Sequence, residues 1–288
     1  MRAAYLGPAG TNSHDALLAA GGDWEPWPRP TVAAVVAAVQ EGAAARALVP
    51  VENSREGGVG ATLDALVFDA PDVVIVGELV HRVTYCLVAG EPVTPDEVRT
   101  VHSHPQATAQ CAGFLAAQLP AAAIVATAST ADAVRSVAAG EPLPGAGPHA
   151  AIGTRGAAAL YGADVLADGI EDDPGNATRF AWLARADDAL LAHGAAAAAG
   201  GGVKTSLVFW GAGDLAPGWL VTCLAEFSSR AVNLTRIESR PRRVGLGHYM
   251  FVCDVLGAAH DDAVAAAIAA LRRHCEAVRV LGSFPGPV

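Results

Sequence analysis

Short polar clusters stand at four points of the sequence where an apolar run gives way to a helical pattern. The clusters read Gly7-Pro8-Ala9-Gly10-Thr11-Asn12-Ser13, Glu52-Asn53-Ser54, Ser103-His104-Pro105-Gln106 and Ser129-Thr130. Free N–H groups and the helix dipole favour anions at the start of a helix. Ser, Thr and Asn also cap helices, which explains any one cluster without a ligand. Four clusters together predict a site for a small, polar, negatively charged molecule.

The elements that carry these clusters alternate between strand and helix. Such βαβα order predicts a parallel sheet with helices on both faces, and ligands of these sheets bind at the carboxyl ends of the strands. Strands are expected at 3–6, 46–51, 73–76, 83–88, 98–102, 122–126, 150–153 and 179–183, and helices at 31–41, 60–68, 105–118, 131–139 and 155–161.

A stretch of glycine and alanine at 194–202 divides the chain, because such side-chain-poor sequence behaves as a linker. Strands are expected beyond it at 204–210, 232–238, 249–255 and 278–281, with helices at 217–230 and 261–274. This βαββαβ order suits a ferredoxin-like sandwich. The expected parts are 1–190, a linker over 191–203, and 204–288.

Composition limits the class of protein. A net charge of −10 disfavours nucleic-acid binding, which needs a clustered positive surface. No apolar run is long enough for a membrane helix, and the apolar start is too short for a signal peptide, so we expect a cytoplasmic protein. Five dispersed cysteines without a C-x-x-C pair fit a reducing compartment. The histidines form no metal-binding pattern, so we expect neither a metal nor another cofactor.

Longer motifs, taken in their order, resemble one family. The first part contains Val49-Pro50-Val51-Glu52-Asn53-Ser54, Thr62-Leu63-Asp64-Ala65-Leu66, Ser103-His104-Pro105-Gln106-Ala107 and Asn176-Ala177-Thr178-Arg179-Phe180. Over nearly its whole length it resembles prephenate dehydratase, whose hallmark is the Thr-Arg-Phe triplet. Lys204-Thr205-Ser206-Leu207, Pro217-Gly218 and the stretches 233–241 and 281–285 resemble an ACT domain, the amino-acid-sensing module of that family.

The resemblance implies an α/β catalytic region like the type II periplasmic binding proteins, with a cleft between two lobes, followed by a ferredoxin-like βαββαβ ACT domain. Lobe 1 would comprise about 1–80 and 170–190, and lobe 2 about 81–169, with crossings near His81 and Ile170. Edge-to-edge pairing of ACT sheets would make a homodimer or homotetramer.

The implied activity is the decarboxylating dehydration of prephenate to phenylpyruvate in L-phenylalanine biosynthesis, by a lyase without a cofactor. The planar guanidinium of Arg179 suits a carboxylate. By the resemblance, Thr178 would donate a hydrogen bond to the departing hydroxyl. Glu52 is a possible acid, or it fixes the turn that follows it. The expected substrate-binding residues are Thr11, Ser13, Asn53, Ser54, Ser103, Gln106, Ser129, Thr130 and Phe180.

The resemblance also implies L-phenylalanine as an effector. The residues expected to bind it are Gly218, Trp219, Leu220, Asn233, Leu234, Glu238, Ser239, Arg240 and Pro241. Two positions depart from the family pattern. Asn12 replaces a phenylalanine and is expected to change substrate contacts. Trp219 replaces a small residue, and we expect its bulk to weaken the response to phenylalanine.

Three alternatives stay open. Arogenate differs from prephenate only by an amino group, so arogenate dehydratase is not excluded. Prephenate decarboxylase would retain the hydroxyl, but its relatives depart from the Glu-Asn-Ser and Thr-Arg-Phe segments that this chain keeps. A non-catalytic amino-acid sensor would not need an intact Thr-Arg-Phe triplet.

Overall fold

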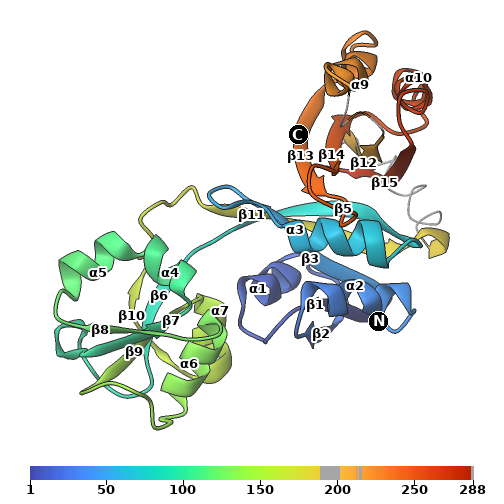
Figure 1. Cartoon of the computed structure of the whole chain (residues 1–288). Helices are drawn as coiled ribbons and strands as arrows, with labels where there is room; N and C mark the ends of the chain where they lie inside the picture. Colours follow the sequence, from blue (N-terminus) through green and yellow to red (C-terminus); the bar gives the residue numbers. More distant parts are fainter. Residues whose placement is uncertain (189–201, 212, 214–215, 287–288) are drawn as a thin grey trace.

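The computed structural model describes residues 1–188, 202–211, 213 and 216–286, so most of the expected linker lies outside the described residues. The chain is a mixed α/β protein with three sheets (Figure 1). Two sheets form two lobes, and the third, with two helices, packs on the first lobe. No helix in the described part of the chain is long and apolar enough to cross a membrane.

The first sheet combines strands from both ends of the first part of the chain. Its order is β2-β1-β3-β11-β5, with β4 beside β3. The strands are β1 (Arg2–Leu6), β2 (Glu25–Arg29), β3 (Arg46–Asn53), β4 (Gly57–Gly58), β5 (Val73–Arg82) and β11 (Ala177–Arg185). The helices are α1 (Asn12–Ala19), α2 (Val32–Gln40) and α3 (Gly60–Asp64), which continues as a π-helical turn, η1 (Ala65–Asp69).

The second sheet lies wholly between β5 and β11 in the sequence. Its order is β10-β6-β9-β7-β8. The strands are β6 (Cys86–Ala89), β7 (Thr100–Ser103), β8 (Ala123–Ala126), β9 (His149–Gly153) and β10 (Asp164–Asp168). The helices are the 3-10 turn η2 (Pro95–Glu97), α4 (Pro105–Gln110), α5 (Ala112–Gln118), α6 (Thr130–Ala138) and α7 (Arg155–Tyr161).

The expectation of parallel sheets is wrong for part of each lobe. β1 runs parallel to β2 and β3, and β7 to β8 and β9. The strands next to the crossings are antiparallel: β11 to both β3 and β5, and β6 to β9 and β10. The chain leaves the first sheet through β5 and returns through β11 in the opposite direction. The alternation of strands and helices in the sequence does not indicate this change of direction.

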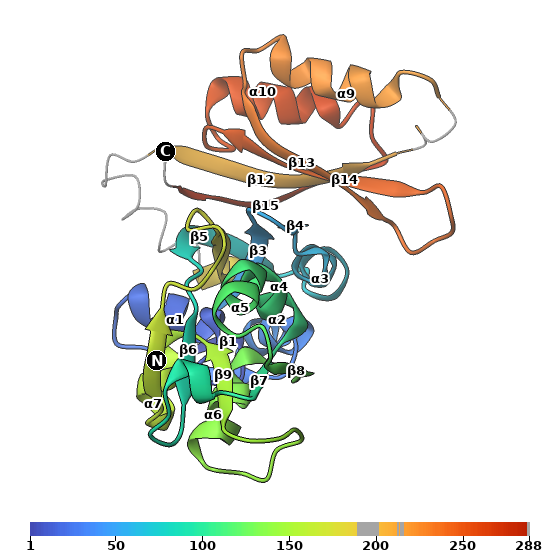
Figure 2. The ribbon, with the colours of Figure 1, turned by 90° about the vertical axis from the view of Figure 1, so that its left-hand side faces the viewer.

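The third sheet has the βαββαβ order predicted from the sequence. Its elements are β12 (Val203–Trp210), α9 (Trp219–Ser228), β13 (Leu234–Pro241), β14 (Tyr249–Leu256), α10 (Asp262–Leu271) and β15 (Ala277–Pro285). The strand order is β13-β14-β12-β15, and every pair is antiparallel. Both helices cover the face that points away from the first lobe (Figure 2).

The other face of the third sheet shares one apolar core with the first lobe. Val208, Val252 and Leu281 are fully buried in the same cluster as Val51 and Ala181 of the first sheet. This continuity of packing fixes the third sheet on the strands β5 and β11. A movement of one sheet must therefore act on the other.

Gly282 is the closest approach of β15 to β5. A Cβ atom at this position would lie 2.1 Å from the backbone oxygen of Ile75, and the φ angle of +152° disfavours a side chain. Gly282→Ala should lower the free energy of unfolding by about 1–3 kcal/mol because the core is overpacked. Urea denaturation measures this. Gly77→Ala, whose Cβ would meet Trp182 at an ordinary 3.6 Å, is the control, and an equal loss in both variants would contradict the packing described.

Candidate active site

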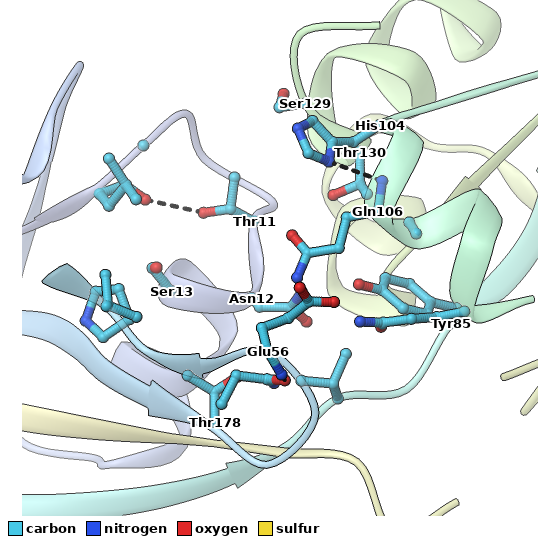
Figure 3. Close-up of a pocket in the computed structure, with 18 of the residues that line it drawn as sticks. Thr11, Asn12, Ser13, Glu56, Tyr85, His104, Gln106, Ser129, Thr130 and Thr178 are labelled. Carbon is cyan, nitrogen blue, oxygen red and sulfur yellow. Dashed lines mark hydrogen bonds between the residues drawn. The ribbon is translucent and has the colours of Figure 1, made fainter. Parts of the chain in front are cut away.

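A cavity of about 450 Å³ opens between the two lobes (Figure 3). Its volume suits a small organic molecule. Residues from both lobes line it: Leu6, Gly7, Thr11, Asn12, Ser13, Pro30, Pro50, Asn53, Glu56, Val59, Thr178 and Phe180 on one side, and Val83, Tyr85, His104, Gln106, Ala107, Gln110, Ala128, Ser129 and Thr130 on the other.

Three helices begin at this cavity. α1 starts at Asn12, α4 follows His104, and α6 starts at Thr130, and all three of these residues are in the lining. Among the described lining residues there is no Arg or Lys. An anion would therefore be held by backbone N–H groups, helix dipoles and neutral side chains. This arrangement supports the prediction of an anion site at the junctions of strands and helices.

Some hydroxyls of the predicted site are occupied by bonds within the protein. The Ser129 hydroxyl donates to Oδ2 of Asp132 over 2.7 Å and accepts from the Asp132 N–H over 3.0 Å. The Thr11 hydroxyl lies 3.0 Å from the carbonyl of Pro8. These side chains fix the starts of the helices. They present the backbone donors of α1 and α6 to the cavity.

His104 closes the start of α4. Its Nδ1 accepts from the N–H of Gln106 over 3.2 Å, so the ring proton of the neutral imidazole sits on Nε2. That atom is a donor available to a ligand. The side chain of Gln106 reaches into the space between the lobes in Figure 3.

Asn53 joins the elements around Thr178. Its Nδ2 donates to Oγ1 of Thr178 and to Oδ1 of Asn176, both over 3.0 Å. Its Oδ1 accepts from the N–H groups of Arg55 and Glu56 over 3.0 and 3.1 Å. Asn176 in turn donates to Gln110 of the second lobe over 2.9 Å. This buried chain of amides holds the Thr178 hydroxyl at the cavity wall.

Three polar groups of the lining were not among the residues expected from the sequence, namely Glu56, Tyr85 and Gln110. Tyr85 is hydrogen-bonded to Asn12 across the lobes, while burial raises the pKa of its phenol to about 12. It therefore stays a hydrogen-bond donor near neutral pH. Glu56 is the one carboxylate among the described lining residues. Glu56 could have been found from the sequence, because it stands three residues after Asn53, in the turn that Asn53 fixes.

Arg179 and Glu52 do not line the cavity, so their predicted contact with substrate is not supported. Side chains alternate along a strand, and Thr178 and Phe180 of β11 point to the cavity while Arg179 points to the third sheet. There Arg179 donates from Nε to Glu52 over 3.1 Å, from Nη1 to Glu78 over 3.0 Å and from Nη2 to Asp254 over 2.9 Å. Its guanidinium is already saturated with carboxylates.

Two predicted serines also lie outside the lining. Ser103 is fully buried and donates to the carbonyl of Ile152 over 2.8 Å. Ser54 accepts from the N–H of Ala177 over 3.0 Å. Both stabilise the lobes, and neither borders the cavity. Thr11, Ser13, Asn53, Gln106, Ser129, Thr130, Thr178 and Phe180 are the predicted residues that the structure brings together.

The residues predicted to bind an effector separate into two groups. Gly218, Trp219 and Leu220 border a second cavity of about 330 Å³ beside α9. The others precede or lie along the edge strand β13: Asn233, Leu234, Glu238, Ser239, Arg240 and Pro241. Glu238 is ion-paired with Arg236, and Arg240 with Asp64 of the first lobe. Within one chain these two groups do not form a single site.

Comparisons with known proteins find similarity along nearly the whole chain. A family model described as prephenate dehydratase matches residues 3–188. The prephenate dehydratase of Mycobacterium sp. (strain JLS) is 41% identical over 99% of this chain and 89% of its own. The crystal structure of prephenate dehydratase from Arthrobacter aurescens, in complex with L-Phe, is 36% identical and has a TM-score of 0.85 over 99% of this chain and 90% of its own. GqqA, described as a novel type of quorum-quenching acylase, is 28% identical, with a TM-score of 0.84 over 99% of this chain and 98% of its own.

Asn53→Ala should destabilise the lobes through the lost amide contacts. It leaves buried partners of Asn53 unsatisfied, so we expect the free energy of unfolding to fall by about 1–3 kcal/mol. Asn233→Ala, the same change at an exposed side chain just before β13, is the control and should cost about 0.5 kcal/mol or less. Urea denaturation compares the two. Equal stability of the wild type and Asn53→Ala would remove Asn53 from the centre of this arrangement.

Proposed function

This chain belongs to the prephenate dehydratase family, and we propose that the cavity between its two lobes is the site of that family's reaction. The chain is an enzyme of the lyase class, as the full-length relatives are. The observation that carries the proposal is the position of Thr178, whose hydroxyl stands in the cavity wall at the centre of a network of buried amides.

The cavity matches what the reaction requires. Prephenate carries two carboxylates and a ring hydroxyl, and it becomes phenylpyruvate when the ring carboxylate leaves as CO2 and the hydroxyl leaves, with a proton, as water. The starts of α1 and α6 supply backbone N–H groups for the carboxylates, whereas the N–H groups of Gln106 and Ala107 at the start of α4 are already bonded to His104. His104 through Nε2, Gln106 and Tyr85 add neutral donors. Gain of aromaticity drives the reaction, so orientation and help to the leaving group are what remains for the protein.

Thr178 is the proposed donor to the departing hydroxyl. Because the amide of Asn53 donates to Oγ1 of Thr178, the Thr178 proton is free to point to another acceptor. The oxygen of the leaving group is such an acceptor, and negative charge grows on it in the transition state. A donor fixed in advance stabilises that charge without reorganisation.

Glu56 takes the place that sequence analysis gave to Glu52. The proton that completes water must come from an acid, and Glu56 is the one carboxyl group in the described lining. Its N–H is held by the same Asn53 side chain that positions Thr178. We propose that the carboxyl group of Glu56, in contact with the bound substrate, donates this proton to the departing hydroxyl. General acid assistance of this kind contributes roughly 10²–10⁴-fold.

The alternatives have less support. The curated relatives that cover nearly the whole chain are named for prephenate. Arogenate differs at its side-chain amino group, and it remains a substrate to be compared with prephenate in the same assay. A decarboxylase would need no donor at the hydroxyl, whereas Thr178 and its amide support are present.

The third sheet and its helices are proposed to be an ACT domain that senses L-phenylalanine. The βαββαβ order supports this assignment, as does the L-Phe bound to the Arthrobacter aurescens enzyme. The edge strand β13 can pair with a second copy of the chain. Such pairing would bring the residues of β13 toward the cavity beside α9 of the partner. We propose that the chain forms a homodimer or homotetramer through this pairing, and that it is cytoplasmic.

Trp219 forms a wall of the cavity beside α9. Its indole N–H donates to the carbonyl of His274 over 2.8 Å, and its ring packs 6.0 Å from that of Phe251 and 6.1 Å from that of Phe209. These contacts draw the indole toward the core of the third sheet. In place of the crowding expected from the sequence, we propose that the indole offers a surface on which an aromatic effector can stack.

Thr178→Ala should lower kcat by roughly 10²-fold or more, with a small effect on KM, because the lost contact acts in the transition state. Thr178→Ser, which keeps the hydroxyl, is the control and should retain most of the activity. Formation of phenylpyruvate from prephenate is followed by absorbance. Turnover of Thr178→Ala near that of the wild type would exclude this residue from the mechanism, and failure of the wild type to form phenylpyruvate would overturn the function itself.

Trp219→Ala should weaken the binding of L-phenylalanine by roughly 10-fold, since one aromatic contact is worth about 0.5–1.5 kcal/mol. Calorimetry with the full chain measures the affinity. Trp210→Ala removes the same bulk from β12, outside the lining of this cavity, and should leave the affinity unchanged. Tighter binding by Trp219→Ala would restore the crowding argument.

A further inference from the structure

A cluster of charges joins the first sheet to the third directly behind the active site. Arg179 of β11 and Glu78 of β5 belong to the first sheet, and they face Asp254 of β14 and Lys204 of β12. Arg179 lies 2.9 Å from Asp254, and Lys204, the one lysine of the sequence, lies 2.6 Å from Glu78. Glu52 of β3 pairs with the same Arg179 and lies 3.8 Å from Arg236 of β13, so each sheet supplies both cations and anions to the other.

The cluster is largely removed from water. The side chains of Glu78 and Asp254 are 1% and 4% exposed, and those of Arg179 and Lys204 are 16% exposed. The second oxygen of Asp254 accepts from the hydroxyl of Ser206 over 2.7 Å. Screening by water is weak at such depth, so these ion pairs have a defined geometry. A change in the position of the third sheet must move the partners of Arg179.

Arg179 is covalently next to Thr178. The two side chains leave β11 on opposite faces, Arg179 to the charge cluster and Thr178 to the active-site cavity. The strand therefore connects the third sheet to the group that is proposed to assist the leaving hydroxyl, without any intervening loop. Displacement of a catalytic group by about 1 Å can cost up to ~100-fold in rate.

We propose that Arg179 is a positioning residue. Its ion pair with Asp254 makes the position of Thr178 in the active-site cavity depend on the position of the third sheet. The inference rests on the function proposed above. Binding of an effector to the third sheet acts at a distance only if it favours one arrangement of the sheets over another. The ion pair between Arg179 and Asp254 is the contact through which such a preference is transmitted to β11. Arg179 then sets kcat, whereas a direct contact with a substrate carboxylate would set KM.

Asp254→Asn tests this in the full chain, because it removes the charge that Arg179 meets and lies outside the active-site cavity. We expect kcat for prephenate to fall roughly 10- to 100-fold with KM within about two-fold of the wild type. Saturating L-phenylalanine should change the rate by a smaller factor than it does in the wild type. Glu78→Gln, the matching change on the first-sheet side, should give the same split between kcat and KM.

Asp64→Asn is the matched control. Asp64 of the first lobe is 16% exposed and pairs with Arg240 and Arg243 of the third unit, so its loss weakens the same interface away from β11. Its basal kcat should stay within about two-fold of the wild type. If Asp254→Asn does not fold, Ser206→Ala decides, since it removes only the donor to the second oxygen of Asp254 and should lower kcat several-fold.

The outcomes separate the inference from the function on which it rests. A folded Asp254→Asn with wild-type kcat and a wild-type response to L-phenylalanine overturns the inference, and so does an equal loss of kcat in Asp64→Asn. A rise in KM at unchanged kcat would return Arg179 to a role in substrate binding. Absence of phenylpyruvate formation by the wild type would instead overturn the proposed function.

Discussion

Strand β11 sends successive side chains to opposite faces of the first sheet, and the arrangement of the whole protein follows from that alternation. Thr178 and Phe180 form part of the cavity between the lobes, while Arg179 between them meets the carboxylates behind the sheet. One short segment therefore takes part in both the reaction site and the contact with the third sheet. A substitution on one face of β11 should change the positions of the side chains on its other face.

The two faces of β11 use different physical chemistry. At the cavity the described wall has no Arg or Lys and one carboxyl group, Glu56. Anions are to be held there by helix starts, amides and hydroxyls, which allows a dianion to bind and its product to leave. Behind the sheet the charges are buried and paired, and removing one partner of such a cluster costs about 3–5 kcal/mol. A rigid charged contact on one side and an accessible wall of hydroxyls and amides on the other suit a strand that must be held while its other face takes part in the reaction.

The sequence predicted the strand–helix junctions that surround the cavity because their residue types have a local cause, the capping of helices. It could not assign Arg179 to a face, since strands buried on both sides lack the alternation of polar and apolar residues that reveals orientation. Tyr85 was missed for a related reason, because it enters the site through the approach of two lobes distant in sequence, whereas Glu56 lies in the turn that directly follows Asn53. The strand β2 was hidden by its two prolines, which an edge strand tolerates.

The central claim is that the cavity between the lobes, and not the guanidinium of Arg179, holds the substrate. A crystal structure of Thr178→Ala with prephenate bound tests this most directly. The account predicts the carboxylates at the starts of α1 and α6 and the ring hydroxyl facing position 178, with Arg179 still bound to Glu78 and Asp254. A substrate carboxylate paired with Arg179, or prephenate bound outside the cavity, would contradict it.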